Sequence, residues 1–213
     1  MNKEKELIDK LIDLAFAEDI GDGDHTTLSC IPATAMGKSK LLIKEAGVLA
    51  GIEVAKEIFN RFDPSMKVEV FINDGTEVKP GDVAMIVEGK VQSLLQTERL
   101  MLNVMQRMSG IATMTRKYAR QLEGTHTRVL DTRKTTPGMR ILEKMAVKIG
   151  GGVNHRIGLF DMILLKDNHV DFAGGIDKAI TRAKEYCKEK GKDLKIEICL
   201  LYTSPSPRDY AAS

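Results

Sequence analysis

The sequence has no tryptophan, few aromatic residues and only three cysteines, and each shortage argues against a class of protein. Aromatic residues make up 5% of the 213 positions, which argues against a stacking surface for nucleic acid. The cysteines form no CxxC pair, which argues against a disulfide framework and a cysteine-based zinc site. No apolar run approaches the ~18–20 residues that cross a bilayer. The N-terminal residues MNKEKELIDKLIDLA contain no secretory signal. We therefore expect a cytoplasmic protein that binds neither nucleic acid nor membrane.

The charge of the chain is nearly balanced overall but not locally. Hydrophobic residues make up 43% and charged residues 29%, which are ordinary values for a globular protein, and the formal net charge is +2. The stretch from residue 128 to residue 169, however, contains eight basic residues and only four acidic ones. A local positive field on a near-neutral protein favours a small polyanionic ligand in a cleft over a broad nucleic-acid surface.

The first half of the chain is expected to form strands packed against helices in an α+β layer. Apolar stripes at helical spacing predict helices at 3–18, 52–62 and 91–123, the last interrupted at Ser109-Gly110. Strands are predicted at 38–44, 67–72 and 83–88, separated by turn sequences such as Asn73-Asp74-Gly75.

After about residue 125 the pattern changes to alternating strands and helices, which predicts a parallel sheet or barrel. Strands are predicted at 128–131, 162–165 and 194–198, and a helix is predicted to open at Thr136-Pro137. Three strands cannot close an α/β barrel, which commonly needs eight. From Cys199 the sequence CLLYTSPSPRDYAAS has no usable period, and we interpret the chain as truncated.

Polar and cationic residues gather where the predicted parallel strands end. Arg133 and Lys134 follow the first strand, Lys166 follows the second, and the glycine-rich stretch GGGVNHRIG between them carries His155 and Arg156. Ligands bind at the carboxyl ends of strands in such folds, because the loops there converge on one opening. Two arginines and two lysines at that opening would suit a substrate with several carboxylates or phosphates.

Simpler interpretations exist for several of these residues. A lone lysine or arginine is usually a solvated surface charge, and that interpretation is favoured for Arg140, Lys144 and Lys148 on the polar face of the predicted helix. His155 could be a structural histidine. No regular carboxylate spacing occurs, so we predict no metal site made by this chain alone.

Five motifs resemble the quinolinate phosphoribosyltransferase family, from about residue 5 to residue 198. In chain order they are EDIGDGDHTT, TERLMLNVMQRMSGIAT, DTRKTTPGMR, GGGVNHRIGLFD and LLKDNHV. The resemblance implies an α/β fold, with an α+β N-terminal domain followed by an open α/β barrel that is incomplete here. We expect the first domain at 1–115, the barrel part at 116–198, and a disordered tail outside the family pattern at 199–213.

The resemblance also implies an activity. The family transfers phosphoribosyl from 5-phosphoribosyl 1-diphosphate to quinolinate, with Mg²⁺ and loss of CO₂, and gives nicotinate mononucleotide and diphosphate for NAD synthesis. Members work as homodimers or larger homo-oligomers. By motif, the residues expected to bind substrate are Arg99 (reaching the neighbouring subunit's site), Thr132, Arg133, Lys134, His155, Arg156 and Lys166. Among these, Lys134 and Lys166 are expected to be catalytic.

One position departs from the family pattern. The third barrel strand keeps Glu197 but has Cys199 where the family has a second, co-substrate-binding glutamate. The Mg²⁺-associated aspartate and the 5-phosphate loops that follow in the family are missing from this chain. We therefore expect an inactive fragment of an active enzyme. Two alternatives stay open: a molybdenum-transport-associated homologue of the same fold, and a non-enzymatic polyanion-binding module.

Overall fold

The computed structural model describes residues 3–199, and the tail expected over 199–213 lies outside them apart from Cys199. The chain forms two compact units, one ending at His155 and the other beginning at Arg156, and each is described by itself. Within residues 3–199, no helix combines the length and the apolar character needed to cross a membrane.

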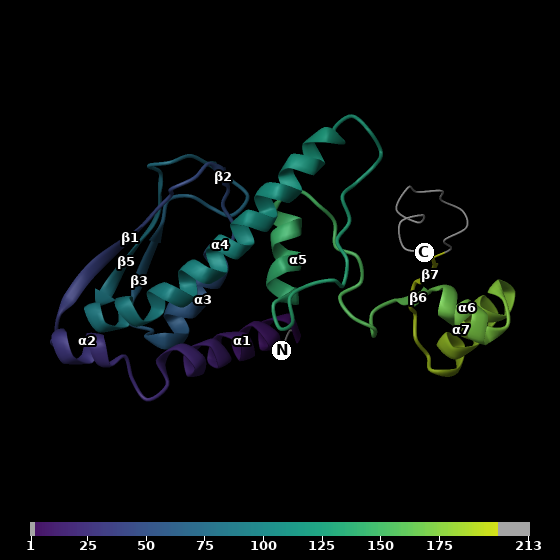
Figure 1. Cartoon of the computed structure of the whole chain (residues 1–213), viewed down its shortest axis with the longest axis horizontal. Coiled ribbons are helices and arrows are strands. Elements are labelled where there is room, and N and C mark those ends of the chain that lie inside the picture. Colours follow the sequence, from purple (N-terminus) through teal and green to yellow (C-terminus); the bar gives the residue numbers. More distant parts are fainter. Residues whose placement is uncertain (1–2, 200–213) are drawn as a thin grey trace, which may run out of the picture. The chain divides into compact units, whose positions relative to one another are not determined.

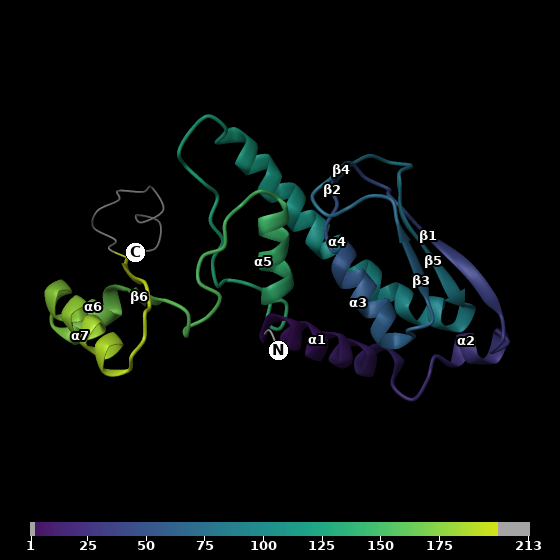
Figure 2. The ribbon, with the colours of Figure 1, turned by 180° about the vertical axis from the view of Figure 1, so that it is seen from behind.

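A sheet of three antiparallel strands forms one layer of the first unit (Figures 1 and 2). The strands of this unit are β1 (Met36–Leu42), β2 (Gly47–Val48), β3 (Lys67–Val70), β4 (Glu77–Val78) and β5 (Val83–Lys90). Strand β5 lies between β1 and β3, and its apolar residues are the most buried of the sheet, as a central strand requires. Strands β2 and β4 form a separate antiparallel pair.

Helices cover this sheet and create two buried clusters. The helices of the first unit are α1 (Lys3–Ile20), α2 (His25–Cys30), α3 (Ile52–Phe62), α4 (Val91–Gln121) and α5 (Arg140–Ile149). In one cluster, Phe59 of α3 and Met105 of α4 pack with Met85 of β5. In the other, Ile12 of α1 and Leu142 of α5 belong to the same buried group as residues of α4. The long helix α4 therefore contributes to both clusters.

Helix α4 runs through Ser109 and Gly110 without a break, so the predicted interruption is wrong. The Ser109 hydroxyl accepts a hydrogen bond from the Ala50 N–H (3.0 Å) and donates to the Ala50 carbonyl oxygen (3.2 Å). One turn later, Thr113 Oγ1 accepts from the N–H of Val48 (2.8 Å). A glycine disfavours a helix interior by about 1 kcal/mol relative to alanine. These tertiary contacts on both sides of Gly110 outweigh that preference.

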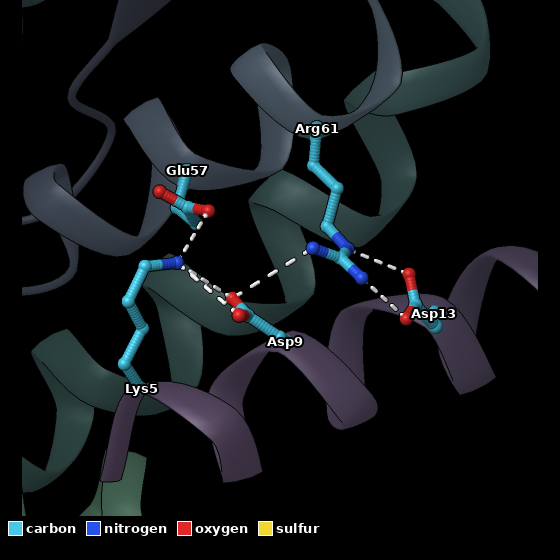
Figure 3. A network of polar contacts seen from close by, with 5 residues as sticks. All are labelled: Lys5, Asp9, Asp13, Glu57 and Arg61. Carbon is cyan, nitrogen blue, oxygen red and sulfur yellow. Dashed lines mark hydrogen bonds and ion pairs between the residues drawn. The ribbon is translucent and has the colours of Figure 1, made fainter. Parts of the chain in front are cut away.

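Charged side chains join α1 to α3 on the surface of the first unit (Figure 3). The Lys5 ammonium lies 3.0 Å from Asp9 Oδ1 on its own helix and 3.1 Å from Glu57 Oε1 on α3. Arg61 of α3 makes a two-pronged contact with Asp13, with Nε donating at 2.6 Å and Nη2 at 2.5 Å. This group of five side chains adds polar contacts between α1 and α3 to the apolar packing of Ile12.

Helix α5 begins at Arg140, three residues later than predicted from the Thr136-Pro137 pair. The reason is Gly138, whose φ of +80° does not fit a helix and makes Pro137-Gly138 part of a turn. The other end of α5 packs closely on α4. A Cβ on Gly150 would lie 2.5 Å from the Ala112 carbonyl oxygen, so only glycine fits there. Arg116 of α4 donates to the carbonyl oxygens of Ile149 and Gly150 (3.3 and 3.0 Å), where a helix end attracts a cation.

The second unit contains one β-α-β arrangement with a small core. Its elements are β6 (Ile163–Leu165), α6 (Asp167–Ala173), α7 (Ile176–Glu189) and β7 (Ile196–Ile198). Strands β6 and β7 are parallel, with Ile163 opposite Ile196. Leu165 packs against Ala179 and Ala183 of α7. The two strands expected in this region are thus present, and residues 3–199 contain no closed barrel.

Candidate functional site

Two segments that carry expected site residues run side by side in the first unit. Leu130 and Val153 form a single parallel bridge, with the Val153 N–H donating to the Val129 carbonyl oxygen (2.8 Å) and the Asp131 N–H donating to the Val153 oxygen (3.2 Å). The strand expected at 128–131 is reduced to this bridge. Because the segments are parallel, their continuations, 132–134 and His155, leave the pairing in the same direction.

Asp131 is the centre of a buried polar cluster just beyond this bridge. Its carboxylate accepts hydrogen bonds from the Lys144 ammonium and from the His155 N–H (2.8 Å). The Lys144 ammonium also donates to the His155 carbonyl oxygen (3.2 Å). With its amide nitrogen turned toward acceptors, Asn154 donates to the other Asp131 oxygen (2.8 Å). The cluster joins the start of the 132–134 segment, helix α5 and the backbone of His155.

The expectation that Lys144 is a solvated surface charge is therefore wrong. Only 3% of its side chain and 7% of the Asp131 side chain are exposed. Helical periodicity places Lys144 off the apolar stripe, but the 131 and 155 segments pack over that side of α5 and exclude water. A buried ammonium needs a paired carboxylate and further acceptors, and both are present. Lys148, by contrast, is exposed as expected, and Arg140 is partly buried.

Glu143, the residue before Lys144, holds the other end of the same segment. Its carboxylate accepts from Arg107 Nε (3.0 Å) and Nη2 (2.7 Å) on α4, and from the Thr136 N–H (3.2 Å). Burial favours the neutral form of this carboxyl, but the hydrogen bonds from Arg107 and Thr136 outweigh burial and hold the pKa of Glu143 below its usual value. Arg107 also donates to Thr136 Oγ1 (3.1 Å).

Arg133 is partly buried, and its Nε has no hydrogen-bond partner among the described residues. Its carbonyl oxygen accepts from Arg140 Nη2 (3.4 Å), while Arg140 Nε donates to Thr135 Oγ1 (3.0 Å). The neighbouring Thr132 and Lys134 side chains are exposed, and Thr132 Oγ1 accepts from the Lys134 N–H (3.1 Å). A buried guanidinium N–H without an acceptor is costly unless a ligand supplies one. A carboxylate or phosphate oxygen is the acceptor that such a group prefers.

Two further expected residues lie in the second unit. Arg156 is 9% exposed, and its Nη1 donates to the Met162 carbonyl oxygen (3.4 Å). The loop after Arg156 is closed by Asp161, which accepts from the N–H groups of Ile157 (2.7 Å) and Gly158 (2.8 Å). Lys166 follows β6 directly with an exposed side chain, as the sequence predicted for a strand end. Its N–H donates to His169 Nδ1 (3.0 Å), which fixes the first turn of α6.

The structure thus gathers four of the expected residues in the first unit and two in the second. Thr132, Arg133, Lys134 and His155 leave the Leu130–Val153 bridge together, whereas Arg156 and Lys166 belong to the second unit. Arg99 lies on the exposed face of α4 in the first unit.

The described residues offer no metal-binding cage made by protein side chains alone. Within residues 3–199, no group of three or more His, Cys, Asp or Glu side chains is placed to hold a metal ion. Mg²⁺ prefers carboxylate oxygens together with substrate phosphates.

Sequence reasoning missed three residues that shape the site: Arg107, Asp131 and Glu143. Asp131 could have been found, because it ends an apolar run directly before the basic segment. Arg107 and Glu143 gave no comparable signal. They lie 36 positions apart, and a charged residue on a helix is ordinarily solvated.

Comparison with sequence families gives two adjoining matches. The pattern of the quinolinate phosphoribosyl transferase N-terminal domain matches residues 24–109, and that of the C-terminal domain matches residues 111–202. The two matches meet at Gly110, inside α4. They leave out little more than the N-terminal helix and the last residues of the chain.

Curated proteins and solved structures agree with these patterns. The chain is 46% identical over 190 residues to quinolinate phosphoribosyltransferase [decarboxylating] 1b of Nicotiana tabacum, covering 88% of this chain and 53% of that protein. It is 45% identical over 189 residues to a chloroplastic nicotinate-nucleotide pyrophosphorylase [carboxylating] of Arabidopsis thaliana, covering 88% and 54%. The chain therefore spans about half the length of these curated relatives.

Among solved structures, NadC from Streptococcus pyogenes superposes with a TM-score of 0.83 at 40% identity, covering 90% of this chain and 67% of that one. The nicotinate-nucleotide pyrophosphorylase from Francisella tularensis gives a TM-score of 0.82 at 36% identity, covering 92% and 69%. These matches confirm the expected fold class: an α+β N-terminal part followed by an incomplete α/β barrel.

Proposed function

This chain belongs to the quinolinate phosphoribosyltransferase family, and we propose that it carries the quinolinate-binding part of the enzyme. The whole enzyme would transfer phosphoribosyl from 5-phosphoribosyl 1-diphosphate to quinolinate with decarboxylation, giving nicotinate mononucleotide, CO₂ and diphosphate for NAD synthesis. The observation that carries this proposal is the buried Nε of Arg133, which has no hydrogen-bond partner among the described residues and lies in a segment held by the buried Lys144–Asp131 pair. A ligand carboxylate would satisfy that donor.

Each expected residue has a role that follows from its chemistry. The planar fork of Arg133, and that of Arg156, would bind the carboxylates of quinolinate, with His155 and Thr132 adding hydrogen bonds. Lys134 and Lys166 would supply compact positive charges beside the reacting groups, which is the catalytic role proposed for them.

In the proposed reaction the pyridine nitrogen attacks the anomeric carbon of the ribose as diphosphate leaves. The neighbouring C–C bond then breaks, the carboxylate departs as CO₂, and the cationic pyridinium ring stabilises the electron pair left on the ring carbon. A proton from solvent takes the place of the carboxylate on that carbon and completes nicotinate mononucleotide. The chain's residues form no covalent bond with the substrate. Their contribution is orientation and charge stabilisation, and removing one such donor commonly costs about 3 kcal/mol of transition-state stabilisation.

Three other features belong to the proposal. Arg99, exposed on α4, would reach the site of a second subunit in a homodimer or larger homo-oligomer. Mg²⁺ entering with the diphosphate co-substrate stays a prediction. A cytoplasmic location also stays a prediction, and some relatives from plants are named as mitochondrial or chloroplastic proteins.

Calorimetric titration of the 213-residue chain tests the binding proposal. We expect quinolinate to bind at least about tenfold more tightly than nicotinate, which lacks one carboxylate and so one charged hydrogen bond. Arg133→Lys keeps the charge but loses the fork, and we expect it to lose most of this preference. Arg120→Lys, an exposed residue of the same unit paired with Glu77, is the matched control. Equal affinity for the two pyridines would contradict the proposal.

A second assay tests the expectation that this chain is inactive. Cys199 stands where the family resemblance expects a co-substrate-binding glutamate. We therefore expect the chain to bind quinolinate without releasing diphosphate from 5-phosphoribosyl 1-diphosphate. Quinolinate-dependent diphosphate release at the rate of a full-length family member would show that expectation to be wrong.

A further inference from the structure

The segment that carries Arg133 and Lys134 is bound at both ends by adjacent residues of one helix. Asp131 precedes the segment and pairs with Lys144, while Thr136 follows it and is bound by Glu143. We call residues 132–135 the basic loop. Adjacent residues on a helix project about 100° apart, so a single turn of α5 reaches both ends of the loop.

The first end of the basic loop is fixed by charge and by backbone. The Lys144–Asp131 pair is almost fully buried, so water weakens it little. The same ammonium binds the His155 carbonyl oxygen, and the same carboxylate binds the His155 N–H. The pair therefore sets the start of the basic loop and the backbone position of His155 together.

The second end is fixed by a carboxylate with two sets of donors. Glu143 accepts from the Thr136 N–H (3.2 Å) and from two nitrogens of Arg107 (3.0 and 2.7 Å). Arg107 in turn donates to Thr136 Oγ1 (3.1 Å). Both the backbone and the side chain of Thr136 are held, and the loop is tied to α4 as well as α5.

We propose that Glu143 and Lys144 are positioning residues that hold the basic loop in its ligand-binding conformation. A loop held at both ends loses little conformational freedom on binding, so its cations need no ordering by the ligand. The consequence for quinolinate rests on the function proposed above. The consequence for loop order does not, because it follows from the contacts of the chain without a ligand.

We call the contacts of Glu143 and Lys144 with the two ends of the basic loop the clamp. Hydrogen exchange of the 213-residue chain without ligand tests the clamp directly. In Glu143→Leu, which removes the acceptor, we expect the amides of residues 133–136 to exchange at least about tenfold faster, as for the loss of one hydrogen bond to a charged group. Glu143→Gln keeps an acceptor oxygen, and we expect it to restore most of the protection. Lys148→Met, an exposed residue of the same helix, is the control and should leave this exchange unchanged.

Quinolinate titration of the same variants tests the functional part. We expect affinity to fall about tenfold or more in Glu143→Leu and to return to within about threefold of the parent in Glu143→Gln. Unchanged exchange in Glu143→Leu would overturn the clamp. Faster exchange with unchanged quinolinate affinity would overturn the positioning role. Faster exchange in a protein whose parent binds no quinolinate would support the clamp and refute the proposed function instead.

Discussion

Lys144 and Asp131 form an ion pair that is almost completely shielded from solvent, although they come from different elements thirteen positions apart. Each charge compensates the burial of the other, and both groups also bind the backbone of His155. Through the backbone of His155 the pair joins the Leu130–Val153 bridge to helix α5. The stability of the first unit and the geometry of its basic loop therefore depend on the same two side chains.

Lys144→Met is expected to lower the free energy of unfolding by about 3–5 kcal/mol, because it leaves the Asp131 carboxylate buried and unpaired. Urea unfolding followed by circular dichroism measures this change. Lys148→Met on the exposed face of the same helix should stay within about 0.5 kcal/mol of the parent. The double variant Asp131→Asn/Lys144→Met should regain much of the loss, since no charge then remains buried. A double variant less stable than Lys144→Met would contradict this account.

Two glycines that look alike in the sequence are expected to respond in opposite ways to alanine. A Cβ on Gly150 would lie 2.5 Å from the Ala112 carbonyl oxygen and 2.7 Å from Thr115 Cβ, so Gly150→Ala should destabilise the chain by about 1–3 kcal/mol. A Cβ on Gly110 would meet no atom within 4 Å, so Gly110→Ala should stabilise α4 by about 0.5–1 kcal/mol. Thermal unfolding of the two variants compares them. Equal shifts of the same sign would refute the packing argument.

Glu143 should make stability depend on pH in a defined direction. The pKa of its carboxyl is lowered on folding: burial acts against this, but the hydrogen bonds from Arg107 and Thr136 prevail. The folded chain therefore binds fewer protons than the unfolded chain near the ordinary glutamate pKa of about 4.3. The stabilisation is fully present above that value and is lost as the pH falls through it toward the lower folded pKa.

Urea unfolding of the parent and Glu143→Gln between about pH 3 and pH 7 measures this dependence. The difference between the two proteins should be larger at pH 7 than at pH 3. Glu123→Gln removes an exposed carboxylate and controls for the change in net charge. A difference that grows toward low pH would show that the sign is wrong.

The ionic contacts between α1 and α3 should respond to salt, whereas the buried pair should not. Arg61→Met removes the two-pronged contact with Asp13 on the surface (Figure 3). Its effect on the free energy of unfolding should shrink as salt rises toward about 1 M, where charges are screened beyond about 3 Å. The effect of Lys144→Met should stay nearly constant over the same range. Parallel salt dependence of the two variants would contradict the difference in burial.

Much of the fold could be predicted from the sequence because local pattern and tertiary environment agree there. The apolar stripe of 52–62 predicts α3 with both ends correct, and the apolar run at 162–165 predicts β6 to within one residue. The errors occur where distant segments decide the outcome. The local sequence at Ser109 predicts a helix break, but the hydrogen bonds between Ser109 and Ala50 keep the helix continuous. Pro137 predicts a helix start, but the positive φ of Gly138 places Pro137 in a turn instead.

The candidate site divides in the same way. Arg133 and Lys166 could be placed at strand ends, because the alternation of strands and helices shows where strands end. The residues that hold the basic loop could not, since their roles depend on contacts such as Arg107 with Glu143, which no local pattern records. Helical periodicity predicts that a charged residue off the apolar stripe is solvated, and it cannot show whether a distant segment covers that residue. Lys144 and Lys148, one turn apart, show both outcomes.

Helix α4 has a consequence for any attempt at dissection. The two family patterns meet at Gly110, yet this one helix supplies Ser109 to the β2 segment, Arg107 to Thr136 and Arg116 to the end of α5. Cutting the polypeptide at that junction would divide α4 between two fragments and would expose apolar side chains that α4 and its neighbours bury in the whole chain. The first compact unit, which ends at His155, therefore contains the whole N-terminal pattern together with the beginning of the C-terminal pattern, and α4 is the element that they share.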